Sequence, residues 1–268
     1  MTTEVQRSAA LPLPDRALLL AVIFSPFLLV LLSTQFPIKH VWVGVIPLGL
    51  ALLYFWRRSF YLFARAVFWP FFYAALLTLP WPLVFVAPLA VYLLLYWRWQ
   101  HFRISTHWLI RGAFTRPTIA WMIPTIVISS AGLLGWVFLF HPDLSDLARM
   151  VPTGGPLALL AVGIAFSVFN AIWEEFTLKG IAWNSLQLVF PRDWQINASQ
   201  AALFGIIHIG GFPRGWMGVL MATLYGLVLG IIRETSRGML APVVTHIFAD
   251  ATIFLVLYFI STGTLAVT

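Results

Sequence analysis

The sequence contains nine apolar runs separated by proline or charged residues, and this pattern limits the fold more than any other feature. The runs cover residues 17–35, 41–56, 60–79, 82–97, 119–140, 156–177, 198–211, 215–232 and 240–260. Hydrophobic residues make up 61% of the chain and charged residues only 9%, which excludes an ordinary soluble domain. A membrane span needs about 20 mostly apolar residues, so the predicted fold is an all-α, polytopic transmembrane bundle of about eight to nine spans.

The basic residues predict how this bundle is oriented. If the N-terminus lies in the cytoplasm, the cytoplasmic segments carry twelve arginines and the outer segments carry three basic residues, Lys39, Arg149 and Arg214. This asymmetry predicts an N-in, C-out topology. Arg7 and Arg16 precede the first run without a small-residue cleavage site, so we expect a retained first span. The expected location is a bacterial cytoplasmic membrane, and we expect no nucleic-acid partner because no basic stripe lies in a soluble segment.

The two parts of the chain differ in where they carry ionisable residues. The first four runs hold almost none away from their ends, so we interpret residues 1–118 as an N-terminal transmembrane scaffold of about four spans followed by a basic cytoplasmic loop. We interpret residues 119–268 as a second helical unit, which carries the candidate functional residues. Within it, Gly218, Ala222, Gly226 and Gly230 recur every four residues, which predicts close helix packing along one ridge.

Ionisable side chains inside three of the later runs are the candidates for function. They are Glu174, Glu175, His208, His246 and Asp250, together with Lys179 just beyond the end of run 156–177. Each such group costs about 2.5–3.5 kcal/mol at the centre of a membrane helix. Taken singly, each could be a helix-end charge or a buried hydrogen-bonded side chain. Their grouping in the last four runs instead predicts that they converge on one polar pocket.

Helical spacing assigns different parts to these side chains. Adjacent helix residues point about 100° apart, so Glu174 and Glu175 cannot face the same way. Glu175 and Lys179 stand at i,i+4 in the favourable order, which predicts an ion pair and leaves Glu174 free for the pocket. Asn170 lies one turn before Glu174 and is expected on the same side.

This set of residues fits attack of water on an amide carbonyl. A buried glutamate can act as the general base, and histidines can share the water or donate to the oxyanion. Glutamate and histidine are also zinc ligands, so Glu174, His208 and His246 would be the ligands if a metal were bound. The sequence lacks cysteine and the HExxH and GxSxG motifs. Haem ligation, a proton relay, and a non-catalytic scaffold or transporter-like binding protein remain alternatives.

Three ordered motifs resemble those of the CPBP family, the CAAX-protease and bacteriocin-processing intramembrane glutamic endopeptidases. They read Glu174-Glu175-Phe-Thr-Leu-Lys179, then Phe204-Gly-Ile-Ile-His208, then His246-Ile-Phe-Ala-Asp250. The resemblance covers about residues 119–260. Lys179 stands where the family usually has arginine, and lysine lacks the planar fork that grips a carboxylate.

The resemblance implies an intramembrane endopeptidase with residues 119–268 as its catalytic helical core, in which Glu174 activates water and His208 assists. His246 and Asp250 would form or orient the oxyanion site, with Asp250 orienting His246 or staying protonated. Glu175, Lys179, Phe204 and Asn170 would be supporting residues. No cofactor is expected, although zinc is left open. The expected partners are the lipid bilayer and a membrane-embedded or lipidated protein or peptide; the family processes prenylated C-termini, bacteriocin leaders and C-terminal sorting tails.

The predicted topology contains one conflict. It places Glu174 near the cytoplasmic side and His208 near the outer side, although one site needs both. We expect either that the Glu174 helix continues past Lys179 to about residue 188, which buries Glu174 more deeply, or that the His208 run is offset.

Overall fold

The computed structural model describes residues 11–33 and 44–265. Within these residues all of the regular secondary structure is helical, and loops and turns connect the helices. This confirms the predicted all-α class. In chain order the helices are α2 (Leu13–Ser33), α3 (Val45–Arg58), α4 (Phe60–Ala66), α5 (Phe68–Thr78), α6 (Leu83–Arg98), α7 (Gln100–Thr106), α8 (Arg116–Phe140), α9 (Ser145–Ala148), α10 (Pro156–Glu175), the π-helix η2 (Phe176–Ala182), α11 (Trp183–Leu186), α12 (Asp193–Ile207), α13 (Gly215–Ser236) and α14 (Leu240–Ser261).

Six helices among the described residues are long and apolar enough to cross a membrane. They are Leu13–Ser33, Phe60–Thr78, Arg116–Phe140, Pro156–Leu186, Gly215–Ser236 and Leu240–Ser261. The chain is therefore a multi-pass membrane protein, as predicted. The orientation argument used Arg7 and Lys39, which lie outside the described residues, and N-in, C-out stays a prediction.

The predicted count of eight to nine spans is not confirmed. Three predicted runs, 41–56, 82–97 and 198–211, correspond to helices of 14, 16 and 15 residues, namely α3, α6 and α12. Residues 34–35 of the run 17–35 and residues 41–43 of the run 41–56 lie outside the described residues. At 1.5 Å per residue a 15-residue helix reaches about 22 Å, which is shorter than a hydrocarbon core of about 30 Å.

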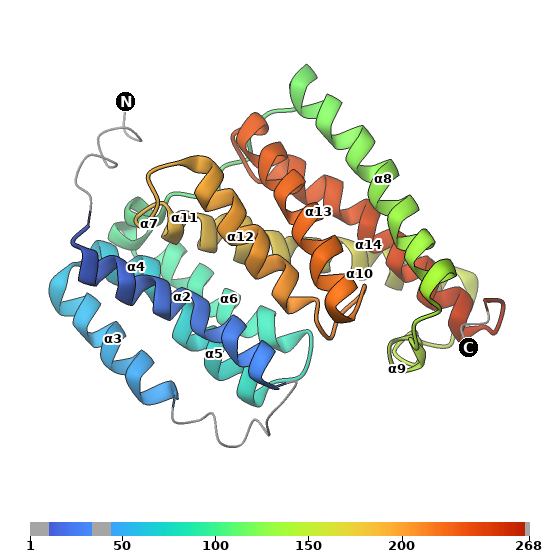
Figure 1. Ribbon diagram of the computed structural model, residues 1–268, viewed down its shortest axis with the longest axis horizontal. Coiled ribbons are helices and arrows are strands. Elements are labelled where there is room, and N and C mark those ends of the chain that lie inside the picture. The colour runs from blue at the N-terminus through green and yellow to red at the C-terminus, as the bar shows by residue number, and fades with distance from the viewer. Residues whose placement is uncertain (1–10, 34–43, 266–268) are drawn as a thin grey trace.

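The helices form two groups (Figure 1). Helices α2 to α6 pack together on one side, and α8, α13 and α14 pack together on the other. Helix α12 joins the groups by packing on α13 and α2, and α10 does so by packing on α14 and α6. The site therefore lies where elements from both parts of the chain meet.

The largest buried apolar cluster extends across the predicted boundary between scaffold and core. On the N-terminal side it contains aromatic residues such as Phe27, Trp69 and Phe72. It continues through Leu178 and Trp183 of the segment that follows Glu175. The N-terminal helices thus bury the C-terminal half of the helix that carries the glutamates, and they contribute to its position.

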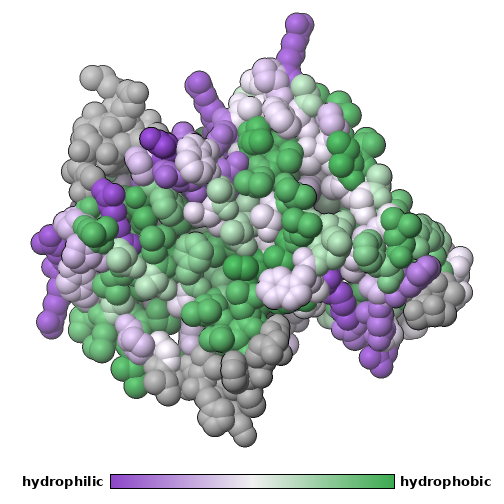
Figure 2. All heavy atoms as spheres, in the orientation of Figure 1, coloured by the Kyte–Doolittle hydropathy of each residue, from purple (hydrophilic) through white to green (hydrophobic). Residues whose placement is uncertain are grey.

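The outer surface of the helices is apolar, as expected for contact with lipid. In α8, for example, Val127, Ile128 and Leu139 are 62%, 70% and 77% exposed. Figure 2 shows hydrophobic residues over much of the visible face, with hydrophilic side chains gathered toward its edges. Exposed aliphatic side chains at this density would be unfavourable in water, but lipid tails solvate them well.

The small-residue ridge of α13 packs as the sequence predicts. A Cβ atom on Gly226 would lie 3.3 Å from the Cα atom of Ala201 in α12, and Gly230 lies directly against Asn197 of the same helix. Asn197 and Gln200 also donate hydrogen bonds, of 3.1 and 2.9 Å, to backbone carbonyls of α13. The absence of side chains on the ridge brings the two backbones close enough for these bonds.

We predict that Gly218→Ala lowers the thermal unfolding temperature in detergent. Its Cβ atom would lie 2.5 Å from the carbonyl carbon of Pro213 and 3.3 Å from the oxygen of His208, so the loop before α13 must move. Such overpacking costs about 1–3 kcal/mol. The matched control is Gly135→Ala in α8, where the new Cβ atom meets nothing within 4 Å. Equal unfolding temperatures for Gly218→Ala and wild type would contradict the close packing.

Candidate functional site

The helix that carries the glutamates is continuous from Pro156 to Leu186, a length of 31 residues. Glu174 and Glu175 therefore lie well inside it, about 18 Å from its C-terminal end. This agrees with the expectation that the helix continues past Lys179. The seven residues after Glu175 form the π-helix η2. π-Helical turns are rare and occur often at functional sites.

An aromatic residue from the preceding linker supports the π-helix. Trp108 is buried, and its ring lies 5.2 Å from that of Phe176 at 76°. A Cβ atom on Gly180 would lie 2.5 Å from the Trp108 ring, so glycine is needed for this approach. The linker between α7 and α8 thus holds the turn that immediately follows the glutamates.

Glu175 and Lys179 form the ion pair that their spacing predicts. The Nζ atom of Lys179 lies 3.4 Å from Oε1 of Glu175, and both side chains are fully buried. The Lys179 ammonium also lies 4.5 Å from the centre of the Phe204 ring. A buried charge is tolerated only when it is paired, and the ring face adds a cation–π contact.

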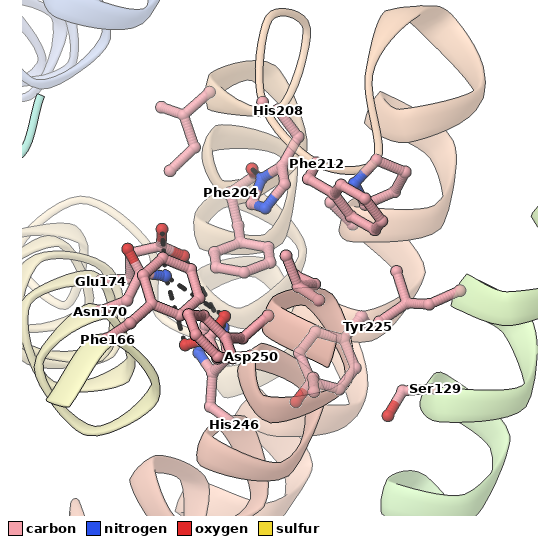
Figure 3. Close-up of a pocket in the computed structure, with 18 of the residues that line it drawn as sticks. Ser129, Phe166, Asn170, Glu174, Phe204, His208, Phe212, Tyr225, His246 and Asp250 are labelled. Carbon is pink, nitrogen blue, oxygen red and sulfur yellow. Dashed lines mark hydrogen bonds and ion pairs between the residues drawn. The ribbon is translucent and has the colours of Figure 1, made fainter. Parts of the chain in front are cut away.

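Asn170 links Glu174 to Asp250. Its Nδ2 atom lies 3.1 Å from Oε1 of Glu174, and 3.3 and 3.2 Å from the two carboxylate oxygens of Asp250 (Figure 3). Asn170 and Glu174 come from α10 and Asp250 from α14, and all three side chains are buried. One amide group therefore holds two carboxyl groups from different helices beside each other.

His246 lies among three carboxyl groups. Its Nδ1 atom is 2.9 Å from Oε1 of Glu175, and its Nε2 atom is 3.7 Å from both Oε2 of Glu174 and Oδ1 of Asp250. We expected Asp250 to orient His246. Asp250 is at ion-pair distance, but the ring donates its hydrogen bond to Glu175, because that carboxylate faces Nδ1 from the neighbouring helix.

His208 lies beside this cluster, on the other side of the Phe204 ring. It is the C-cap residue of α12, where the helix ends, and not the interior residue that the predicted run 198–211 implied. Its Nδ1 atom is 2.8 Å from the backbone oxygen of Phe204. A carbonyl oxygen only accepts hydrogen bonds, so Nδ1 carries a proton, and in the neutral ring Nε2 is left as an acceptor. The rings of Phe204 and His208 are 4.7 Å apart.

A cavity of about 990 Å³ connects these residues. Its polar lining consists mainly of Asn170, Glu174, His208, Tyr225, His246 and Asp250 (Figure 3). Glu175 and Lys179 do not line it. As the spacing predicts, Glu174 faces the cavity. Glu175 instead pairs with Lys179 and His246.

The remaining walls of the cavity are apolar and come from both parts of the chain. Many residues of α8, α10, α13 and α14 line it, together with five residues of the N-terminal part of the chain, Val30, Phe72, Leu76, Trp81 and Phe85. A volume of this size would hold a drug-sized ligand or a lipid chain. The predicted scaffold thus contributes directly to the space next to Glu174.

An exposed ion pair links two segments that border the cavity. Arg214, in the loop before α13, lies 3.0 Å from Oδ2 of Asp146 in α9, and it also donates to the backbone oxygen of Asp143. The hydrogen bond from Arg214 lowers the pKa of the Asp146 carboxyl below its usual value. Leu147 and Pro213, next to these residues, line the cavity.

Sequence reasoning missed two contributors to the site. Trp173 donates a hydrogen bond of 3.0 Å from Nε1 to Oδ1 of Asn170. Tyr225 lines the cavity with its ring 5.5 Å from that of His246, edge to face. Both could have been found from spacing, because Trp173 is one turn from Asn170 and Tyr225 lies next to the small-residue ridge. Aromatic residues are so common in this chain that neither position drew attention.

No group of three histidine, aspartate or glutamate side chains in residues 11–33 and 44–265 has an arrangement that could hold a metal ion. Glu174, His208 and His246, the ligands expected if a metal were bound, do not form such a group. In this geometry both ring nitrogens of His246 already face carboxylates, and Nδ1 of His208 faces a carbonyl oxygen.

The fold and site together define a multi-pass helical membrane protein with a buried acid–histidine cluster beside an apolar cavity. Comparison with known families adds that residues 156–252 match the family described as type II CAAX prenyl endopeptidase Rce1-like. The resemblance predicted from the three motifs is thereby confirmed, and this segment, which holds every predicted site residue, is CAAX-protease-like. No similar curated protein and no similar solved structure was found.

We predict that Lys179→Met destabilises the protein by about 3–5 kcal/mol, because Glu175 would stay buried without its cationic partner. Thermal unfolding in detergent measures the loss. The matched control is the double variant Glu175→Gln/Lys179→Met, which removes both charges and should recover a large part of the stability. If Lys179→Met alone unfolds at the wild-type temperature, the ion pair does not hold the site together.

Proposed function

We propose that this protein is an intramembrane endopeptidase that hydrolyses a peptide bond of a membrane-associated or lipidated protein, using water activated by Glu174. The family match supports protease activity. The observation that carries the glutamate assignment is that Glu174 is buried, lines the cavity, and keeps its Oε2 atom without a hydrogen-bond partner. A buried carboxylate oxygen that has no hydrogen-bond partner keeps a lone pair that can accept a proton.

In the proposed reaction, Oε2 of Glu174 takes a proton from water while the water oxygen attacks the carbonyl carbon of the substrate. The carbonyl oxygen becomes an oxyanion. The C–N bond then breaks, and the proton passes from Glu174 to the leaving amine nitrogen. Each step needs only a group that accepts and then returns one proton, which a single buried carboxylate can supply.

The two histidines take different parts in this proposal. Nε2 of His208 is left as an acceptor by the bond from Nδ1 to Phe204, so it can help to orient the water. His246 is held by Glu175 and can donate from Nε2 to the oxyanion when both ring nitrogens carry protons. Asp250 helps to position this ring, and the Asn170 amide keeps Asp250 beside Glu174.

The shape of the cavity supports an amphiphilic substrate. Polar groups gather on one part of the wall, and the rest is formed by aromatic and aliphatic side chains from both parts of the chain. We propose that the scissile bond lies near Glu174 and that the apolar part of the substrate lies against the apolar walls. A prenylated C-terminal peptide and a hydrophobic peptide segment both have this character. A bacterial cytoplasmic membrane is the proposed location.

We predict that Glu174→Gln abolishes proteolysis, lowering its rate by about 10²–10⁴-fold, because glutamine cannot accept the proton of water. The test expresses wild type and Glu174→Gln at equal levels in a host membrane and compares protein termini by mass spectrometry. Termini that appear only with wild type identify the substrates and the cleavage sites.

The matched control is Glu234→Gln, the same substitution at an exposed glutamate of α13 that does not line the cavity. It should produce the same termini as wild type. If every terminus found with wild type is also found with Glu174→Gln, the proposal is wrong. A binding or scaffold role then becomes the better explanation of the polar pocket.

We predict that Gly132→Leu raises the KM for a quenched fluorescent farnesylated CAAX peptide in proteoliposomes. Gly132 lines the cavity, and its Cβ atom would lie 3.9 Å from Met221, so a leucine would fill space that the substrate needs. Gly135→Leu is the control, since it lies almost one turn along α8 and outside the lining. Equal KM values for the two variants would mean that the cavity does not bind this substrate.

A further inference from the structure

The side-chain amide of Asn170 makes two kinds of hydrogen bond in the candidate site. Its nitrogen faces three carboxylate oxygens, one from Glu174 and two from Asp250, at 3.1–3.3 Å. Its oxygen accepts from the indole nitrogen of Trp173 at 3.0 Å. The amide group has two N–H donors, so one hydrogen can serve each carboxyl group.

This arrangement works in only one orientation of the amide. If the amide of Asn170 turned by 180°, its oxygen would face three acceptor oxygens and its nitrogen would face the indole N–H of Trp173. Acceptors would then meet acceptors and donors would meet donors, inside a buried cluster where unpaired polar groups are costly. The Trp173 indole has one donor and no acceptor, so it can hydrogen-bond to the Asn170 amide in only one of the two orientations.

We propose that Trp173 is a positioning residue that fixes the Asn170 amide and, through it, the carboxyl group of Glu174. The inference rests on the proposed function. Because Asn170 holds Oε1 of Glu174, the same geometry leaves Oε2 as the oxygen that receives the proton of water. Trp173 acts through Asn170 and needs no contact with the reacting atoms.

An aromatic residue from the N-terminal part of the chain contacts Trp173. Trp81 lies in the turn between α5 and α6, and its ring is 6.1 Å from that of Trp173 at 79°. Trp81 also contacts the Phe166 ring at 6.1 Å. Residues 156–252 match the protease family and Trp81 lies outside them, so the positioning chain starts in the part of the protein that the family match does not cover.

The test removes the indole N–H while keeping an aromatic ring, by Trp173→Phe. With the farnesylated CAAX peptide in proteoliposomes we expect kcat to fall about three- to tenfold, the range for loss of one neutral hydrogen bond, with KM within about twofold of wild type. In the Asn170→Ala background, Trp173→Phe should cause no further loss of kcat, because the two residues act through one interaction. Trp97→Phe, an exposed position of α6, is the control.

A second measurement needs no substrate. In protein labelled with ¹⁵N at the tryptophan indoles, Trp173→Phe identifies the Trp173 N–H resonance. That proton should exchange slowly with solvent in wild type and faster in Asn170→Ala, while Trp97→Phe leaves it unchanged.

The outcomes separate the two proposals. If wild type does not cleave the peptide and no termini depend on Glu174, the proposed function fails and the positioning role fails with it. If wild type cleaves but kcat of Trp173→Phe equals that of wild type, the positioning role alone is overturned. Multiplicative losses in the double variant, or unchanged exchange of the Trp173 proton in Asn170→Ala, also overturn it.

Discussion

The buried contact of Glu175 with Lys179 and His246 is the interaction on which the site depends. A carboxylate in a nonpolar interior needs compensation, and Glu175 obtains it from an ammonium at 3.4 Å and an imidazole nitrogen at 2.9 Å. Because His246 comes from α14, this contact joins the helix of the glutamates to the last helix of the chain. With α10 and α14 held together, Glu174 and Asp250 meet across the same junction and share the Asn170 amide.

The lysine at position 179 fits this role through its surroundings. Arginine grips a carboxylate with a planar fork, whereas lysine is a point charge that needs other contacts to define its place. Here the Phe204 ring supplies one such contact, with the ammonium 4.5 Å from the ring centre. The same ring separates His208 from His246. Phe204 therefore contacts the Lys179 ammonium and also keeps the two histidine rings of the cavity apart.

Much of the fold and site followed from helical spacing within single segments. The i,i+4 positions of Glu175 and Lys179, of Asn170 and Glu174, and of the α13 ridge predicted contacts that the structure shows. Contacts between helices were harder to predict. The hydrogen bond from His246 to Glu175 joins residues 71 positions apart. Nothing in the spacing on either helix favours Glu175 over Asp250 as the partner of His246.

The span count is hard to predict for a related reason. Hydropathy marks a segment as apolar but does not say whether it crosses the bilayer alone. Helix α12 is polar enough to bond to α13 through Asn197 and Gln200, and it is buried between α13 and α2. A short helix enclosed by longer ones need not meet the lipid along its whole length. The loop that follows α12 at His208 also satisfies part of its own backbone, because the amides of Gly211 and Gly215 donate to the carbonyl oxygens of His208 and Ile209.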